Sequence, residues 1–371
     1  MGARTRGLAN NVLSSGKLDA TDAISGTIAA DNIANASLDN ATTYGSVTGG
    51  VPQVAGDPPA PAEGDIWYNT NTGAIRLRSK ANTWVTGGNM NTARNSFNGG
   101  AGTQTAALIA GGSGPPFSAL TESYNGSAWT EVNDLNTARY GSLMRGVQTS
   151  ALVAGGVNGN ASPENPGFTR TGQTESWDGS SWTEVNDLNT ARSDTGGAGT
   201  DNTSALCVAG KNPAANPPAG LLALTESWNG TSWTEVNDLN TASEQKTTVG
   251  TATAALAFGG NPGPSNTAQT ETWNGTSWTE VNDLNTARGF LGGSGTNTAA
   301  LAFGGNIPPA TASTESWDGT NWSNVDNLST ARFQLAGLGT NTLSLAAGGY
   351  STTPLASTEE WGEVDITFTV G

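Results

Sequence analysis

The chain of 371 residues carries 31 acidic and 15 basic residues, and its formal net charge of −16 repels nucleic-acid phosphates and anionic membranes. It contains no histidine, which excludes imidazole general bases and histidine-ligated zinc, copper or haem sites. Its 51 glycines and 12 tryptophans are typical of many short strands joined by tight turns, and they exclude a protein of long helices.

The ends of the chain and its cysteine are simple to interpret. The N-terminal sequence lacks the apolar core of a signal peptide, and no stretch approaches the roughly 18 apolar residues of a membrane span. We therefore expect a soluble chain that is neither exported by a signal peptide nor inserted into a membrane. Cys207 is the only cysteine, so it cannot form an intramolecular disulfide, and we expect it to be a small buried hydrophobe.

The first 56 residues differ from the rest of the chain. Isolated aliphatic residues stand among alanine, serine, threonine, asparagine and aspartate, and no apolar run has the length of a strand. Such a segment cannot fold alone, so it needs copies of itself in an oligomer or a surface to lie on. We expect a largely extended attachment arm in a homo-oligomer, with a trimer favoured. Its candidate contact residues are Arg4, Arg6, Leu18, Ile24, Ile28, Ile33 and Leu38.

Residues 57–88 are predicted to form a proline-rich linker and a small β-hairpin module. Residues 57–61 read D-P-P-A-P, and residues 64–77 have the pattern of a β-hairpin. The second strand of this hairpin is expected to continue through Trp84.

From residue 89 onward the chain repeats the line T-E-S-W-[ND]-G-x-S-W-T-E-V-N-D-L-N-T-A-R almost verbatim. The first aromatic residue of the line recurs six times, at intervals of 44 to 53 residues. These aromatic residues are Tyr124, Trp177, Trp228, Trp273, Trp317 and Trp361. A second tryptophan follows five residues later in the first five copies, at Trp129, Trp182, Trp233, Trp278 and Trp322. The chain therefore contains six units, of which the last is a variant.

Each unit is predicted to form four short strands. In the second unit, residues 133–139 lead into the first strand, and residues 149–154 form the second. Residues 174–177 and 182–185 form the third and fourth. Asp178 and Gly179 between them predict a two-residue type I′ turn, and the same Asn-Gly or Asp-Gly pair occurs in five copies.

A lone unit of this size cannot bury both faces of its sheet, so the units must pack on one another. Small residues fill the first two predicted strands and tryptophan occupies the third and fourth, a taper that favours a closed ring. We therefore predict an all-β fold in which residues 89–371 form a six-bladed β-propeller of four-stranded antiparallel blades.

Two segments compete for the outer strand of the last blade. Trp84 stands ten residues before Arg94, as Trp129 stands before Arg139, so Trp84 aligns with the fourth-strand tryptophan of the repeat. The alternative is the strand-like run at residues 365–370. We favour the C-terminal run.

The repeats share an order of marker residues. It consists of a glycine pair, an aromatic residue, a tryptophan five residues later and an arginine before the next unit. The pairs stand at residues 111–112, 155–156, 259–260, 304–305 and 348–349, with Gly210 and Lys211 in the third unit. The arginines are Arg94, Arg139, Arg192, Arg288 and Arg332, with Ser243 in the fourth unit. This order resembles the kelch repeat of β-propellers. The resemblance implies a kelch-like fold, but the copper chemistry of kelch-like oxidases needs histidine ligands that this chain lacks.

The N-terminal region carries a second resemblance. Residues 25–40 read S-G-x-I-x-x-x-N-I-x-N-x-S-L-D-N, and residues 64–73 read G-x-I-W-Y-N-x-x-T-G. Both patterns resemble those of tail-fibre and virion-surface proteins of marine, particularly cyanobacterial, bacteriophages. The resemblance implies a virion protein, made in the host cytoplasm, that contacts other virion proteins through residues 1–56 and faces outward with its propeller.

The repeated charged residues are interpreted as structural. A catalytic carboxylate pair is needed once, so a glutamate in every unit, such as Glu122 or Glu175, is expected to satisfy a hydrogen bond of its blade. The repeated arginines could ring a channel mouth and bind an anion, but pairing with loop carboxylates such as Asp134 is favoured. We predict no catalytic residue, metal site or cofactor.

The connections between the second and third strands differ most among the units, and they emerge on the same face as the links between blades. A recognition surface needs diverse loops on a rigid scaffold, so this face is the predicted ligand-binding face. Its candidate residues are Phe117, Phe168, Arg170, Leu221, Leu222 and Tyr350. Tolerated variation in loop length is the alternative interpretation.

Together these patterns predict a non-enzymatic virion protein that recognises a host-surface polysaccharide through many weak sites. Three alternatives stay open. The propeller could decorate the particle without a ligand, it could be a polysaccharide-degrading enzyme that uses carboxylates only, or it could be a free intracellular kelch scaffold.

Overall fold

The computed structural model describes residues 52–59, 61–97, 99–114, 117–158, 169–212 and 220–370, with the backbone alone for 366–370. This part of the chain contains strands and no helix. It divides into two compact units: Trp84–Gly362 form one, and the residues before and after this range form the other. The division differs from the predicted boundaries, which placed the propeller at residues 89–371. Most of the predicted arm, with its seven candidate contact residues, lies outside the described residues.

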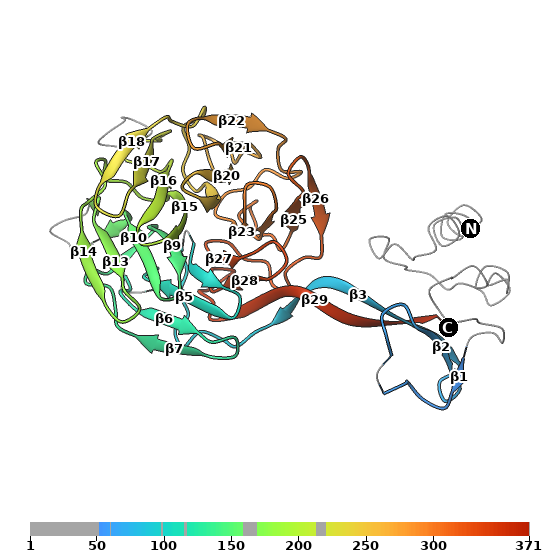
Figure 1. The fold of residues 1–371 in the computed structure, drawn as a ribbon. Helices are drawn as coiled ribbons and strands as arrows, with labels where there is room; N and C mark the ends of the chain where they lie inside the picture. Colours follow the sequence, from blue (N-terminus) through green and yellow to red (C-terminus); the bar gives the residue numbers. More distant parts are fainter. Residues whose placement is uncertain are drawn as a thin grey trace. The chain divides into compact units, whose positions relative to one another are not determined.

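The unit Trp84–Gly362 is a six-bladed β-propeller, as predicted (Figure 1). Blade 1 contains β4 (Ala101–Thr103), β5 (Ala106–Ala110), β6 (Thr121–Tyr124) and β7 (Trp129–Val132). Blade 2 contains β9 (Leu143–Val147), β10 (Ser150–Ala154), β13 (Thr174–Trp177) and β14 (Trp182–Val185). Blade 3 contains β15 (Gly196–Asp201), β16 (Ser204–Val208), β17 (Thr225–Trp228) and β18 (Trp233–Val236).

The other three blades follow the same order. Blade 4 contains β19 (Thr247–Thr251), β20 (Ala254–Phe258), β21 (Thr270–Trp273) and β22 (Trp278–Val281). Blade 5 contains β23 (Gly292–Gly295), β24 (Ala300–Phe303), β25 (Thr314–Trp317) and β26 (Trp322–Val325). Blade 6 contains β27 (Ala336–Gly339), β28 (Ser344–Ala347), the first part of β29 (Thr358–Val370) and the last part of β3 (Ala74–Thr86). The innermost strands contact one another in sequence, and β27 meets β4 to complete the circle.

Small residues allow the innermost strands to converge on the axis. A Cβ atom added at Gly337 in β27 would lie 2.4 Å from the backbone nitrogen of Gly293 in β23. That is closer than a carbon atom can approach, so glycine is required where adjacent inner strands meet. The larger apolar side chains lie further out, in clusters between neighbouring blades. Cys207 is buried in one of these clusters, as predicted.

Each blade is joined to the preceding one by an indole. A tryptophan of the outer strand donates from Nε1 to the hydroxyl of the threonine that opens the third strand of the blade before it, at 3.0 to 3.3 Å. It is the first residue of that strand in blades 1 to 5, and in blade 6 it is Trp84, near the end of β3. The pairs are Trp129–Thr358, Trp182–Thr121, Trp233–Thr174, Trp278–Thr225, Trp322–Thr270 and Trp84–Thr314. Indole and hydroxyl are both buried, so each bond joins two blades inside the core.

The ring is closed by the Trp84 strand, and our preference for residues 365–370 was wrong. The sheet order places β3 outside β29, so blade 6 takes its outer strand from the N-terminal side of the propeller. Trp84 packs on Phe303 of blade 5, with ring centroids 4.8 Å apart. Trp322 makes the equivalent contact with Phe258 of blade 4, and the Trp84 indole donates to Thr314 as the other outer tryptophans do to their threonines. These contacts are the physical reason for the assignment. Residues 363–370 instead belong to the other unit.

The turn between the third and fourth strands is longer than predicted. Trp177 and Trp182 are paired across the two strands, so the loop contains residues 178–181 and not two residues. Only Gly179 has a positive φ, at 96°, whereas a type I′ turn requires two such residues. The Asp178 carboxylate accepts hydrogen bonds from the backbone N–H groups of Ser180 and Ser181, which stabilises the four-residue loop.

The second unit contains the predicted hairpin. Strand β2 (Ile66–Asn69) pairs antiparallel with β3, and β1 (Gln53–Val54) lies parallel to β2. Asp57 accepts hydrogen bonds from the Trp67 indole and the Asn69 amide, and it forms an ion pair with Arg76 at 3.1 Å. The start of the proline-rich linker is therefore fixed to the hairpin.

Candidate functional site

The repeated arginine of each unit forms a buried ion pair with the repeated glutamate of the third strand. Arg94 contacts Glu122 at 2.7 Å, and Arg288 contacts Glu315 at 3.1 Å. Arg139, Arg192 and Arg332 pair in the same way with Glu175, Glu226 and Glu359. These side chains are at most 3 % exposed. The repeated arginines therefore do not line a channel mouth.

The favoured pairing of these arginines with Asp134-type carboxylates is also wrong. The Asp134 carboxylate accepts a hydrogen bond from the backbone N–H of Thr121 at 3.0 Å. The equivalent aspartates of blades 2 to 4 do the same, and in blade 5 the side-chain oxygen of Asn327 takes this role. Glu175 accepts from the backbone N–H groups of Asn136 and Thr137 as well as from Arg139. The prediction that the repeated glutamates satisfy hydrogen bonds of the blade is confirmed. The charged side chains of the repeated line therefore serve to stabilise the fold.

Blade 4 departs from this pattern. Ser243 replaces the arginine, and the ammonium group of Lys246, three residues later, lies 4.0 Å from the carboxylate of Glu271. Burial lowers the pKa of Lys246, and the nearby carboxylates, Glu271 foremost, oppose this effect. Lys246 Nζ, Glu271 Oε1 and Ser243 Oγ are buried without a hydrogen-bond partner. A single cation therefore replaces the arginine with poorer geometry.

Six residues in the left-handed backbone region surround the axis at one end of the propeller. Each stands two positions after the repeated arginine, or after Ser243 in blade 4, with φ between 54° and 64°. They are Ser96, Gly141, Asp194, Gln245, Phe290 and Gln334. The backbone N–H of each of the last five donates to the carbonyl of the one before it, at 2.7 to 3.3 Å, and Phe97 N–H closes the circle on Gln334 at 3.4 Å. The strain of five non-glycine residues is thus offset by a closed ring of hydrogen bonds.

Around this ring the links between blades pair with the connections between second and third strands. The residue after each arginine, or after Ser243, pairs with the residue after each glycine pair. The pairs are Asn95–Ser113, Tyr140–Val157, Ser193–Lys211, Glu244–Asn261, Gly289–Asn306 and Phe333–Tyr350. The third glycine pair is replaced by Ala209 and Gly210, with φ of 59° and 111°, and not by Gly210 and Lys211 as predicted. Lys211 instead occupies the position after the pair.

We call these twelve paired residues, the six left-handed residues and the connections beside them the variable face. The repeated line is almost identical in every unit, whereas the residues at these positions differ from blade to blade. The small sheet of β8 (Arg139–Tyr140), β11 (Val157–Asn158) and β12 (Thr169–Arg170) belongs to this face. The opposite end carries short turns such as residues 178–181.

The variable face has an aromatic half. Phe333 lies 5.5 Å from Tyr350 and 6.3 Å from Phe290, measured between ring centroids, on blades 5 and 6 and their links. Phe117 of blade 1 lies 4.7 Å from Tyr140 on the link to blade 2. All five rings are partly exposed. Because blades 5, 6, 1 and 2 are consecutive, the rings occupy one side of the axis.

The other half is charged and comes from blades 2 to 4. Arg170 donates to the Ser193 hydroxyl at 3.1 Å, and that hydroxyl donates to Asp194 at 2.9 Å. Lys211 forms an ion pair with Glu244 at 3.1 Å. Burial raises the pKa of Asp194 to about 6; Glu244 adds to this effect, while the Ser193 hydrogen bond and the charges of Arg170 and Lys211 oppose it.

The predicted ligand residues fall on this face where the structure describes them. Phe117, Arg170, Leu221 and Tyr350 are partly exposed, and each takes part in the strand-like pairing beside the ring. Leu222 is 6 % exposed and belongs to the interior, so it is not available to a ligand. Phe168 lies outside the described residues.

Several residues of the variable face were not predicted. They are Tyr140, Asp194, Lys211, Glu244, Phe290 and Phe333. Five of these six occupy the first or second position after the repeated arginine, or after Ser243, and Lys211 follows the glycine pair. Alignment of the six units at the arginine would have identified five, because the identity of the repeats ends there. The variation in loop length points instead to the connections within blades.

The described residues contain no group of three or more cysteine, aspartate or glutamate side chains placed to ligate a metal ion. In the same part of the chain, no helix is long and apolar enough to cross a membrane.

Comparison with known proteins supports the fold and leaves the chemistry open. No protein-family model matches the chain, and no curated protein is similar to it in sequence. Among solved structures, YjhT superimposes with a TM-score of 0.60 at 12 % sequence identity, over 75 % of this chain and 99 % of its own. At this identity the likeness shows a shared β-propeller fold.

Proposed function

We propose that this protein is a non-enzymatic adhesin of a bacteriophage virion, which displays the variable face to a polysaccharide on the host surface. One observation carries the proposal: variation among otherwise near-identical repeats is concentrated on one end of the propeller. Apart from the arginine that Ser243 replaces in blade 4, the charged residues that hold the blades recur from unit to unit, so the partly exposed residues that differ at equivalent positions are free to serve recognition.

The chemistry of the variable face fits a sugar. Aromatic faces such as those of Phe333 and Tyr350 stack on the apolar side of pyranose rings, and the serine and asparagine side chains nearby supply hydrogen bonds. Arg170 and Lys211 on the charged half favour a polysaccharide that bears some acidic groups. Individual sites of this kind are weak, and many copies on one particle convert them into avidity.

The virion assignment rests on the resemblance of residues 25–40 and 64–73 to phage tail-fibre and surface proteins. In this proposal residues 1–56 attach the protein, as a homo-oligomer, to other virion proteins. The repeated glutamates are committed to buried ion pairs, which argues against a hydrolase built on them.

Binding to purified host-surface polysaccharide tests the recognition. The full chain immobilised on a sensor is expected to bind, and Tyr350→Ala with Phe333→Ala is expected to weaken binding by about tenfold or more, since one stacking ring contributes on the order of 1 kcal/mol. Val147→Ala, which alters the exposed last residue of β9 in blade 2, serves as the matched control. Equal loss in both variants would refute the site. Release of oligosaccharides during the incubation would show an enzyme instead.

The attachment is tested separately by deleting residues 1–56. Particles assembled with the truncated chain are expected to lack the protein while the purified truncated protein still binds polysaccharide. Unchanged incorporation would contradict the attachment role. Incorporation without any polysaccharide binding by the native protein would identify a decoration protein.

A further inference from the structure

One buried cation of the propeller has no carboxylate partner. Arg145 lies on the innermost strand β9 and is 8 % exposed. The five repeated arginines each have a glutamate, but none of the ion pairs among the described residues includes Arg145. Burial lowers its pKa to about 10, and no nearby carboxylate opposes this effect. The side chain therefore remains positively charged at neutral pH.

The Arg145 guanidinium is held across three blades. Nε donates to the carbonyl of Gly197 at 2.5 Å, Nη1 to that of Met144 at 2.7 Å and Nη2 to that of Thr248 at 2.6 Å. A guanidinium has five N–H groups, so two remain beyond these three bonds. Gly99 makes room for it, because a Cβ atom there would lie 1.7 Å from Nη1. The group is thus fixed in position and retains donors to offer.

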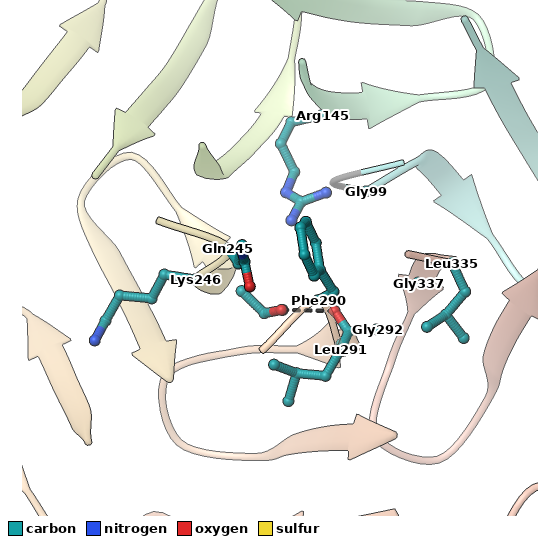
Figure 2. A pocket seen from close by; sticks show the side chains of 11 residues that line it. Gly99, Arg145, Gln245, Lys246, Phe290, Leu291, Gly292, Leu335 and Gly337 are labelled. Carbon is teal, nitrogen blue, oxygen red and sulfur yellow. Dashed lines mark hydrogen bonds between the residues drawn. The ribbon is translucent and has the colours of Figure 1, made fainter. Parts of the chain in front are cut away.

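A small cavity lies beside Arg145 on the axis. Figure 2 shows the guanidinium pointing toward Phe290, with Gln245 nearby, and glycines of β23 and β27 complete the wall. The space suits about one water molecule or a single ion. Arg145 and Lys246 are the charged residues of the lining, and no acidic residue contributes to it. The Lys246 ammonium points away from this cavity in Figure 2.

We infer that the axial cavity binds a small inorganic anion of halide size, such as chloride, through the remaining N–H groups of Arg145. An uncompensated charge in a desolvated site is costly, and an anion placed against the guanidinium would offset that cost. The cavity is too small for a sugar carboxylate. Gln245 and Phe290 belong both to the variable face and to the lining of this cavity, but the cavity admits no sugar. A bound anion would therefore stabilise the ring in the absence of any glycan.

Bromide provides the direct test. Crystals of the full chain soaked in sodium bromide are expected to show an anomalous peak within hydrogen-bonding distance of the Arg145 guanidinium. Absence of that peak would overturn the inference. Arg145 would then serve only to join the blades through its hydrogen bonds to backbone carbonyls. This measurement uses the native protein, so it does not depend on whether any variant folds.

Thermal unfolding provides a second test in solution. At equal ionic strength, Tm is expected to be about 1–3 °C higher in sodium chloride or bromide than in sodium gluconate, whose anion is too large to enter. Arg145→Gln should abolish this difference. Arg332→Lys, which alters an arginine that has a glutamate partner, should lower Tm but keep the difference. A halide effect that survives in Arg145→Gln would contradict the proposed site.

Discussion

At the scale of single residues, the charged groups of this propeller have two distinct roles. Arginine and glutamate of the repeated line are buried together, so each supplies the partner that the other needs in a medium of low polarity. On the variable face the charges belong to single blades and remain partly exposed. The buried ion pairs can be tested in blade 4, and the charges of the variable face can be tested at Asp194.

The first prediction restores the regular ion pair in blade 4. Ser243→Arg with Lys246→Leu installs the arginine of the other blades and the leucine that blade 5 carries at Leu291. The double variant is expected to unfold at higher denaturant concentration than the native protein, by about 1–2 kcal/mol, because a fork of N–H groups replaces a cation without hydrogen bonds.

Lys246→Leu alone is the control for that prediction. It leaves Glu271 buried without a cation and should cost about 3–5 kcal/mol. The interpretation fails if the double variant is no more stable than Lys246→Leu alone.

The second prediction concerns the pH dependence of stability. The pKa of Asp194 is raised from 3.8 to about 6 in the folded protein, chiefly by burial, so the folded state binds a proton more tightly than the unfolded state. Its contribution to the free energy of unfolding is therefore fully present below pH 3.8 and declines as pH rises to about 6. Asp194→Asn should remove this decline between those values when denaturant midpoints are measured across pH. An unchanged profile would count against the assigned environment.

At the scale of strands and blades, closure depends on one indole contact repeated six times. Trp84 and Trp322 each donate from the indole to a threonine of the preceding blade. The third prediction is therefore that Trp84→Ala and Trp322→Ala destabilise the protein to a similar extent, about 3–5 kcal/mol each. Denaturant unfolding of both variants measures this. A loss below about 1 kcal/mol for Trp84→Ala alone would mean that its strand does not close the ring.

Much of this level was predictable from the repeats. Strand order, blade number and the taper from glycine to tryptophan follow from periodicity and side-chain size, which act locally. The partner of Arg139 was not predictable, because Asp134 and Glu175 are both repeated acids and only the path of the chain decides between them. The outer strand of blade 6 was mispredicted for a related reason. Residues 365–370 have strand character, but the tryptophan contact with blade 5 that Trp84 makes is a tertiary feature.

At the scale of the whole molecule, a rigid ring carries its diversity at one end. The candidate face could be placed from the connections within blades, because their lengths differ visibly. The residues at its centre, such as Asp194 and Phe290, could not be recognised as neighbours before the ring of backbone hydrogen bonds brought them together. In this arrangement, the recognition residues of the variable face can change without altering the core of the propeller.

The central claim is that the partly exposed residues of the variable face that differ among the repeats serve recognition and not stability. The position after the glycine pair is asparagine in blades 4 and 5, at Asn261 and Asn306, but Lys211 in blade 3 and Tyr350 in blade 6. Lys211→Asn with Tyr350→Asn therefore makes these blades alike with a residue the fold already accepts. The most direct measurement is the affinity of this variant for host-surface polysaccharide, beside its Tm. We predict a Tm within about 2 °C of the native value and binding weakened by about tenfold or more. Native affinity in the variant would contradict the account.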